Sequence, residues 1–381
     1  MIPYWRLSGY YFFYFAFVGA FSPYFSLYLQ SIGRSAAQIA LLMSLLSVMR
    51  LVAPNLWGWL ADRLGARVPI VRLSAVLSLA GFAGFLMTES PVGLFASMAV
   101  LAFFWSAALP LVEALTFSHL GAHASRYGSI RVWGSVGFIL AVLGLGYVLD
   151  GAPIRTLLWI TLGLLGGILV YAAVLPEGAA PAHSMNPASL GEVLRRREVR
   201  ALLTACFFMS AAHGALYVFY SVHLVQLGHH KTLVGWMWTL GVVAEIAVFM
   251  AMPQILRRYS LRGILLFSFA VAVVRFLLIG WGANSLAVLI LAQIGHGATF
   301  GAYHAAGVAA INRWFGPQLQ ARGQALYGSV SFGAGGMVGG VVSGYTWDSI
   351  GAGWTYTLGS AFALMGLAVL LAGWRPAVRE A

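Results

Sequence analysis

The chain has 381 residues, of which 61% are hydrophobic and only 8% are charged. Soluble domains carry about 25% charged residues, so the composition excludes that class, and its apolar content also excludes a disordered chain. The formal net charge is +12, but the basic residues are spread over many loops and form no single patch, so we expect no nucleic-acid partner. The sequence therefore predicts a protein that crosses a membrane several times.

Apolar runs of about 20 residues or more, each long enough to cross a hydrocarbon layer of about 30 Å, recur twelve times. The first run is too long and too aromatic for a cleaved signal peptide, so we expect it to remain as a helix. The predicted spans are 7–31, 36–60, 68–88, 91–118, 128–149, 155–175, 198–227, 232–256, 262–282, 285–314, 322–348 and 354–373.

The longest polar connector, residues 177–197, is rich in Pro, Ala and Ser and reads as a cytoplasmic linker. It predicts an N-terminal six-helix domain over 1–176 and a C-terminal six-helix domain over 198–381. Of the 22 Lys and Arg residues, only Arg34, Arg155 and Lys231 fall on the side away from the N terminus, and Arg50, Arg131 and Arg275 fall within spans. The positive-inside rule then places both termini in the cytoplasm.

The two predicted domains repeat one another. Phe12-Phe13 recurs as Phe207-Phe208, and Tyr127-Gly128-Ser129 recurs as Tyr327-Gly328-Ser329. Two six-helix halves of the same orientation are typical of a parallel-repeat transporter with a substrate site at the midplane.

Two charges of opposite sign stand out inside apolar spans. Glu113 and Arg131 lie at similar distances on either side of the polar turn 121–125, so we expect them at similar depth. Ionised groups in a membrane are costly and usually functional, which predicts a buried ion pair facing an aqueous cavity. The alternative is a pair that only joins two helices.

Other polar and aromatic residues within the spans are candidates for the same cavity. Glu245 shares a helical face with Trp238 and Gly241, and must either find a cation or be protonated, as a proton carrier would be. Histidines could relay protons or bind an anion, or could simply pack against neighbouring helices. The cavity candidates are His213, Tyr217, His296, Tyr303 and His304, with Tyr14 and Phe17 from the aromatic stripe of the first span, which packing alone would also explain.

Small residues at three- and four-residue spacing mark two predicted helices. Such surfaces let helices approach and slide, although close packing without motion would explain them nearly as well. They are Gly134, Gly137 and Gly144 on the fifth span and Gly335, Gly336, Gly339, Gly340 and Gly344 on the eleventh. The single cysteine, Cys206, offers no disulfide, zinc site or redox motif, and we expect no metal or organic cofactor.

The loop that contains Gly58, Asp62, Arg63, Gly65 and Arg67 resembles the signature between helices two and three of the major facilitator superfamily. The resemblance implies a cytoplasmic gate in which the charges hold helix ends together and Gly58 allows close helix approach. A helix end that only carries solvated charges is the alternative.

Nearly the whole chain resembles the 3-phenylpropionate permease branch of that superfamily, itself similar to lactose permease. The segments that carry this resemblance are 127–135, 240–245 and 293–300. The resemblance implies that Glu113 and Arg131 contact substrate and that Arg275 and His296 match an arginine and a histidine of lactose permease. The chain departs at Thr299, where lactose permease has the carboxylate central to proton coupling.

The sequence therefore favours a proton-coupled symporter of a small organic anion, by the resemblance an aromatic carboxylate. A sugar or nucleoside symporter is the alternative, followed by drug efflux and a non-transporting nutrient sensor. No enzyme motif is present. We expect a monomer in a bacterial inner membrane, with a small-molecule substrate, the lipid bilayer as its surroundings and the proton as coupling ion. The predicted substrate-binding residues are Glu113, Arg131, Tyr14, Phe17, His213, Tyr217, Trp238 and Tyr303. The predicted proton-coupling residues are Glu245, Arg275, His296 and His304.

Overall fold

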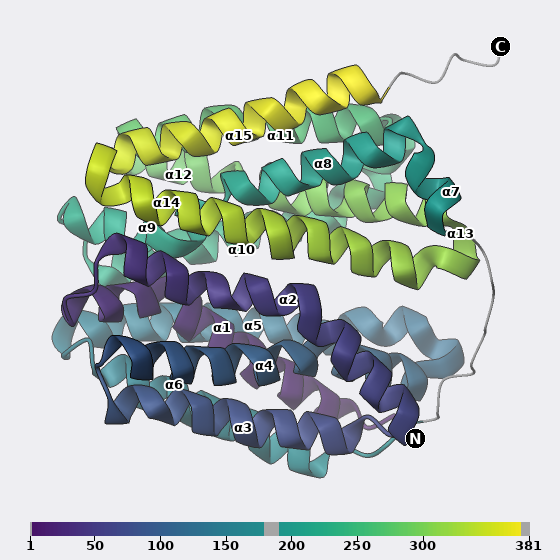
Figure 1. The fold of residues 1–381 in the computed structure, drawn as a ribbon, viewed down its shortest axis with the longest axis horizontal. Helices are drawn as coiled ribbons and strands as arrows, with labels where there is room; N and C mark the ends of the chain where they lie inside the picture. The colour runs from purple at the N-terminus through teal and green to yellow at the C-terminus, as the bar shows by residue number, and fades with distance from the viewer. Residues whose placement is uncertain (1, 179–189, 375–381) are drawn as a thin grey trace. The chain divides into compact units, whose positions relative to one another are not determined.

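The computed structural model describes residues 2–178 and 190–374, and every regular element in these residues is helical (Figure 1). Eleven helical stretches are long and apolar enough to cross a membrane. One of them, Pro91–Gly151, has 61 residues and joins two predicted spans through a short 3₁₀ turn. The prediction of an all-helical membrane protein is confirmed.

The chain divides into two compact units. Unit 1 comprises Met1–Ser184 with Gly228–Trp236, and unit 2 comprises Met185–Leu227 with Met237–Ala381. Much of the predicted linker 177–197 lies outside the described residues. Its final part contains the short helix α7 (Leu190–Arg195).

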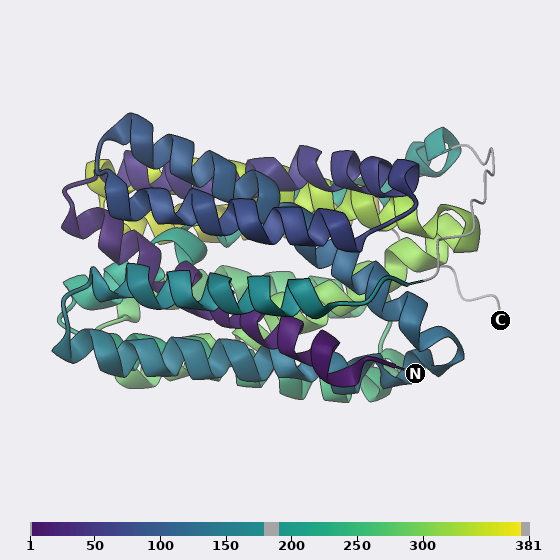
Figure 2. The same cartoon turned by 90° about the horizontal axis from the view of Figure 1, so that it is seen from below.

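Unit 1 is a bundle in which α1 packs on α5 and α6, α3 on α4 and α6, and α2 on α4 (Figure 2). The rings of Phe17, Phe21, Phe25, Phe82 and Phe85 fill its centre. Its elements are α1 (Tyr4–Ser31), α2 (Ala36–Leu64), α3 (Val68–Met87), α4 (Pro91–Leu120), η1 (Gly121–Arg126), α5 (Tyr127–Gly151) and α6 (Thr156–Val174).

Local sequence sets where several of these helices begin and end. Ser35 and Gln38 form a reciprocal capping box at the start of α2. Gly65 ends α2 in the left-handed conformation at φ 63°, which glycine adopts without steric cost. Ser90 caps α4, whose first residue is Pro91, a position where the missing N–H costs nothing.

A reciprocal arrangement ties α3 to the end of α6. The Arg72 guanidinium donates to the carbonyl oxygens of Ala172, Ala173 and Leu175, which have no partners within α6. In return, the Glu177 carboxylate accepts hydrogen bonds from the backbone N–H groups of Arg67 and Val68, at the start of α3. Each charge lies where the helix dipole favours it.

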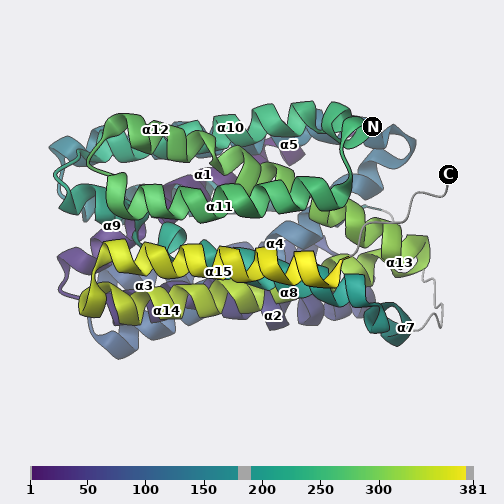
Figure 3. The same ribbon diagram turned by 90° about the horizontal axis from the view of Figure 1, so that it is seen from above.

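Unit 2 contains α8 (Arg197–Ala212), α9 (Gly214–Gln226), α10 (Lys231–Arg258), α11 (Leu261–Gly282), α12 (Leu286–Ile294), η2 (Gly297–Ala302), α13 (Tyr303–Gly328), η3 (Ser329–Gly335), α14 (Gly336–Ile350) and α15 (Ala352–Gly373). The first residues of α10 group with unit 1. In unit 2, α15 packs on α8 and α11, and α14 on α9 (Figure 3).

Three predicted helices of unit 2 are not continuous. The seventh span breaks at His213, between α8 and α9. The tenth is divided into α12, the π-helical η2 and α13, and the eleventh contains a second π-helical segment, η3. The predicted tenth and eleventh spans, 285–314 and 322–348, meet within α13, where the φ of 62° at Gly316 breaks the direction of the helix. Such π-helical segments are frequent at functional sites.

Glycine contacts support the internal repeat. A Cβ atom on Gly137 would overlap the Phe12 carbonyl in unit 1, and one on Gly335 would overlap the Phe207 carbonyl in unit 2. Phe12 and Phe207 are equivalent residues of the sequence repeat, so both units use a glycine at the same helix crossing. The predicted small-residue stripe is wrong at Gly144, where a Cβ would meet nothing within 4 Å.

Candidate functional site

In unit 1, the Glu113 carboxylate accepts a hydrogen bond from a tyrosine. Glu113 lies on α4 and is partly exposed, and its Oε1 accepts a hydrogen bond of 3.2 Å from the Tyr127 hydroxyl at the start of α5. The Tyr127 ring stacks on Phe117, one turn beyond Glu113, with centroids 4.6 Å apart. Tyr127 therefore contacts α4 through both its ring and its hydroxyl.

Arg131, one turn beyond Tyr127, faces aromatic rings of α1. Its Cζ atom lies 3.8 Å from the centroid of Phe15 and 5.8 Å from that of Tyr11, within the range of cation–π attraction. No Arg131 nitrogen lies within 4.0 Å of a Glu113 carboxylate oxygen, although the two charges still act on one another. The predicted Glu113–Arg131 ion pair is therefore wrong, because Tyr127 binds the carboxylate and Phe15 covers the guanidinium.

The two aromatic candidates of α1 lie in the core of unit 1. Tyr14 stacks on Trp105 at 4.8 Å with nearly parallel rings, and Phe17 contacts Trp105 and Phe82. Tyr14 is 3% exposed and Phe17 is 1% exposed. This placement favours the packing alternative for both residues.

In unit 2, Arg275 on α11 is buried and donates hydrogen bonds to three neutral acceptors. Its Nε donates to the Ala292 carbonyl at 2.7 Å, Nη2 to Gln293 Oε1 at 2.8 Å and Nη1 to Thr299 Oγ1 at 3.1 Å. Gln293 in turn donates to the Met237 carbonyl. This network joins α11 to α12, η2 and α10.

His213 completes the surroundings of Arg275 and is held in one tautomer. Its Nδ1 lies 2.8 Å from the Met209 carbonyl oxygen, which can only accept, so the ring proton is on Nδ1. Its Nε2 lies 3.5 Å from Arg275 Nη1, which can only donate, so Nε2 is the acceptor in that contact. His213 therefore contributes a neutral ring to the network.

Glu245 pairs with a histidine from the neighbouring helix. Its Oε2 lies 3.8 Å from His296 Nε2, at the junction of α12 and η2. A Cβ on Gly241 would come within 3.3 Å of the His296 ring. Gly241 and Glu245 therefore face the same element, as their helical spacing predicts.

A row of rings continues from this pair. The His296 ring stacks on Phe300 at 5.5 Å, and Phe300 stacks on His304 at 5.8 Å. The Nδ1 atom of His304 lies 3.1 Å from the Tyr327 hydroxyl. All four predicted proton-coupling residues, Glu245, Arg275, His296 and His304, thus lie beside the π-helical segment η2.

The remaining aromatic candidates of unit 2 have different surroundings. Tyr303 is 1% exposed, and its hydroxyl lies 3.1 Å from Ser331 Oγ in the core, which favours a structural role. Trp238 is largely buried and donates to Ser221. Tyr217 stacks between His213 and Trp238 and is 36% exposed, which leaves it the most accessible of the group.

The predicted gate motif lies at the end of α2. Asp62 and Arg63 are exposed, with the Arg63 guanidinium 5.4 Å from the Trp59 ring. Gly65 caps the helix, and the Arg67 backbone N–H binds Glu177. A Cβ on Gly58 would meet nothing within 4 Å, so the predicted close helix approach at Gly58 is wrong in this conformation.

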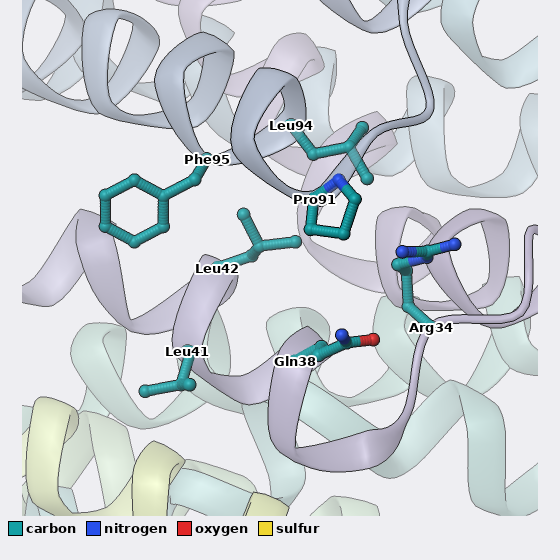
Figure 4. Close-up of a pocket in the computed structure, with 7 residues that line it drawn as sticks. All are labelled: Arg34, Gln38, Leu41, Leu42, Pro91, Leu94 and Phe95. Carbon is teal, nitrogen blue, oxygen red and sulfur yellow. The ribbon is translucent and has the colours of Figure 1, made fainter.

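A hollow of about 160 Å³ lies between the N-terminal ends of α2 and α4 (Figure 4). It is lined by Arg34, Gln38, Leu41, Leu42, Pro91, Leu94 and Phe95. None of the predicted site residues lines it. Within the described residues, no three His, Cys, Asp or Glu side chains gather as a metal ion would require.

Sequence reasoning missed two tyrosines that the structure brings to titratable groups. Tyr127 donates to Glu113, and the Tyr327 hydroxyl bonds His304. Both belong to the Tyr-Gly-Ser triplet that recurs in the two halves of the sequence. The repeat was therefore a signal for the site as well as for the fold.

A family model, described as the MFS_1-like family, matches residues 4–358. The chain belongs to this family. The transporter is thus a multi-pass membrane protein of the major facilitator type, and its homologues are transporters rather than enzymes.

Relatives span almost the whole transporter. It is 30% identical over 353 residues to the "Probable 3-phenylpropionic acid transporter" of Escherichia coli K12, covering 92% of each chain. It is 28% identical to the "Maltose permease" of Geobacillus stearothermophilus, covering 95% of this chain and 92% of the relative. A crystal structure of a mutant form of the nucleoside transporter NupG superposes with a TM-score of 0.86 at 18% identity, covering 97% of this chain and 99% of that chain. That likeness shows the fold alone.

Proposed function

We propose that the protein is a proton-coupled symporter that moves a small organic anion, an aromatic carboxylate such as 3-phenylpropionate, by alternating access. The observation that carries this proposal is Arg131, a guanidinium within an apolar span that has no carboxylate of the described chain within 4.0 Å. It lies over the face of Phe15 and is partly exposed. A guanidinium binds a carboxylate through two parallel hydrogen bonds, and the neighbouring ring offers a contact for an aromatic substrate.

Arg275 is a less suitable clamp for the substrate. It is 2% exposed, and its donors are directed to Ala292, Gln293 and Thr299. A substrate carboxylate would have to displace these partners. We therefore assign substrate binding to Arg131 and a positioning role to Arg275.

The coupled proton is assigned to the Glu245–His296 pair. The pair combines a carboxylate and an imidazole at 3.8 Å, with side-chain exposures of 22% and 9%. An imidazole can change its charge near neutral pH, and a carboxylate inside a membrane is retained mainly where it has a function. Thr299, which occupies the position of the lactose permease carboxylate, bonds Arg275 instead.

The same proposal includes the membrane topology, the oligomeric state and the location of the protein. Twelve spans place both termini in the cytoplasm, and the protein works as a monomer in a bacterial inner membrane without an organic cofactor. Supporting this are the distribution of Lys and Arg residues and the junction η1, which separates α4 from α5 within the longest apolar stretch.

A sugar or nucleoside symporter is the second candidate. A relative named maltose permease favours it. In that case Glu113 and the Tyr127 hydroxyl would bind substrate hydroxyl groups directly.

A binding panel followed by uptake tests the proposal. Purified protein is titrated with 3-phenylpropionate, maltose and uridine, and the ligand that binds is then offered to proteoliposomes with an imposed pH gradient. We expect the acid alone to bind, and an inwardly directed proton gradient to drive its accumulation. If the protein binds maltose or uridine but not the acid, the anion assignment is rejected. If accumulation of the acid does not depend on the proton gradient, proton coupling is rejected.

A further inference from the structure

The separation of Glu113 from Arg131 in unit 1 depends on one side chain. We propose that Tyr127 is a positioning residue that sets anion specificity: its hydroxyl retains the Glu113 carboxylate on α4, so that Arg131 stays open to the carboxylate of the substrate. This inference rests on the proposed function of Arg131 as an anion clamp. It gives Tyr127 a role that acts through two other residues.

Tyr127 is fixed on two sides. Its ring stacks on Phe117 at 4.6 Å with an interplanar angle of 19°, and it forms a T-shaped pair with the Tyr11 ring at 6.5 Å. Phe117 and Glu113 are four residues apart on α4 and therefore share a face. The stacking holds the Tyr127 hydroxyl at the height of the Glu113 carboxylate, where it makes the 3.2 Å hydrogen bond.

The other tyrosine of this cluster is committed elsewhere. Thr116 Oγ1 donates to the Val112 carbonyl at 2.7 Å, so its hydrogen is used. The Tyr11 hydroxyl, 3.2 Å from Thr116 Oγ1, must therefore be the donor in that contact. Tyr127 is then the side chain of the described cluster that donates to Glu113.

Arg131 is the strongest competing partner for Glu113. It lies one turn after Tyr127 on α5, and its charge acts on the carboxylate without touching it. A guanidinium–carboxylate contact is stronger than a hydroxyl–carboxylate bond. If the Tyr127 hydroxyl is removed, the freed carboxylate will turn to Arg131 and occupy the position that a substrate carboxylate needs.

Protonation of Glu113 would remove this competition. The titratable and charged groups around Glu113 are Tyr11 and Tyr14 of α1 with Tyr127 and Arg131 of α5, while Arg50 of α2 acts on Tyr14. Of the residue types in this cluster, only a carboxylic acid ordinarily has its pKa in the acidic range. Within this cluster, a change with acidic pH in the binding deficit of a Tyr127 variant therefore reports on the protonation of Glu113.

The test is a double-mutant cycle on binding of 3-phenylpropionate to the full-length purified protein. We expect Tyr127→Phe to weaken binding about tenfold at neutral pH, since one charged contact now competes with the ligand. The double variant Tyr127→Phe with Glu113→Gln should bind as the wild type does, because no carboxylate remains to compete. Tyr11→Phe, which removes a hydroxyl from the same cluster without freeing Glu113, is the matched control and should leave binding within about twofold of the wild type.

A structural role would give a different pattern. If Tyr127→Phe only loosened the bundle, adding Glu113→Gln would not restore binding, and that result overturns the inference. Wild-type binding in Tyr127→Phe at neutral pH also overturns it. The expected deficit should shrink at acidic pH as Glu113 becomes protonated, and a deficit that does not change with pH contradicts the inference.

The proposed function can fail separately. If the wild type does not bind the acid, or if Arg131→Lys binds it as the wild type does, the anion clamp itself is rejected. If Arg131→Lys loses binding while Tyr127→Phe does not, only the role of Tyr127 is rejected. Thermal melting of every variant in one detergent identifies any that have not folded.

Discussion

Arg275 is expected to stabilise unit 2, and Arg275→Lys tests this role. The guanidinium makes three hydrogen bonds of 2.7, 2.8 and 3.1 Å to groups outside its own helix. A lysine carries one nitrogen at the end of a flexible chain and cannot reach all three groups, so about two of these bonds are lost. Hydrogen bonds within membrane proteins average about 0.6 kcal/mol and reach about 1.7, which gives a loss of about 1–3 kcal/mol.

The assay is thermal unfolding in a single detergent, followed by the intrinsic fluorescence of the tryptophans. A loss of this size should lower the melting temperature by several degrees, at about 2–4 °C per kcal/mol for large domains. Arg258→Lys is the matched control, because Arg258 is exposed at the end of α10. If the two variants have the same melting temperature, the Arg275 network does not stabilise unit 2 and the reasoning from its hydrogen bonds is refuted.

Two further predictions address coupling and packing. Glu245→Gln should abolish accumulation against a gradient but spare counterflow exchange in proteoliposomes, because exchange needs no net proton movement; full accumulation would assign the coupled proton to another residue. Gly137→Ala should reduce the yield of folded protein, since the new methyl would overlap the Phe12 carbonyl and overpacking costs about 1–3 kcal/mol. Gly144→Ala, on the same helix with nothing within 4 Å, should express normally, and equal yields of the two variants in size-exclusion chromatography would contradict the close crossing.

The boundaries of most helices could be predicted because their signals are local. Apolar runs set the lengths, and Ser35, Gly65 and Pro91 mark ends by their own chemistry. The breaks in unit 2 have no such local signal. The π-helical segment η2 contains Thr299, which bonds Arg275 from a different helix, and no periodicity in the sequence encodes that contact.

The candidate site shows the same limit. Counting residues on either side of a turn predicted a similar depth for Glu113 and Arg131, but it could not predict the partners of either side chain. The carboxylate goes to Tyr127 because that ring stacks on Phe117, and the guanidinium goes to Phe15 because α1 packs on α5. Spacing places two charges in the same region, while neighbouring aromatic rings decide whether they touch.

Glycine spacing is equally ambiguous without the packing. Gly137 and Gly144 are seven residues apart and look alike in the sequence, yet only Gly137 lies against another backbone. The repeat helps here, because Gly335 makes the equivalent contact with Phe207 in unit 2. A glycine contact that occurs in both halves identifies a close helix crossing, which the glycine spacing of one helix cannot identify by itself.

The central claim is that Arg131 binds the carboxylate of an aromatic acid while Glu113 does not contact it. Isothermal titration of 3-phenylpropionate against Arg131→Lys and Glu113→Gln tests it most directly. We predict that Arg131→Lys weakens binding by about 1.5–3 kcal/mol, the range for hydrogen bonds to charged groups, because lysine cannot form the paired contact. Glu113→Gln should bind the acid at least as tightly as the wild type. An equal and severe loss in both variants would contradict the account, since both residues would then contact the substrate as they would a sugar or nucleoside.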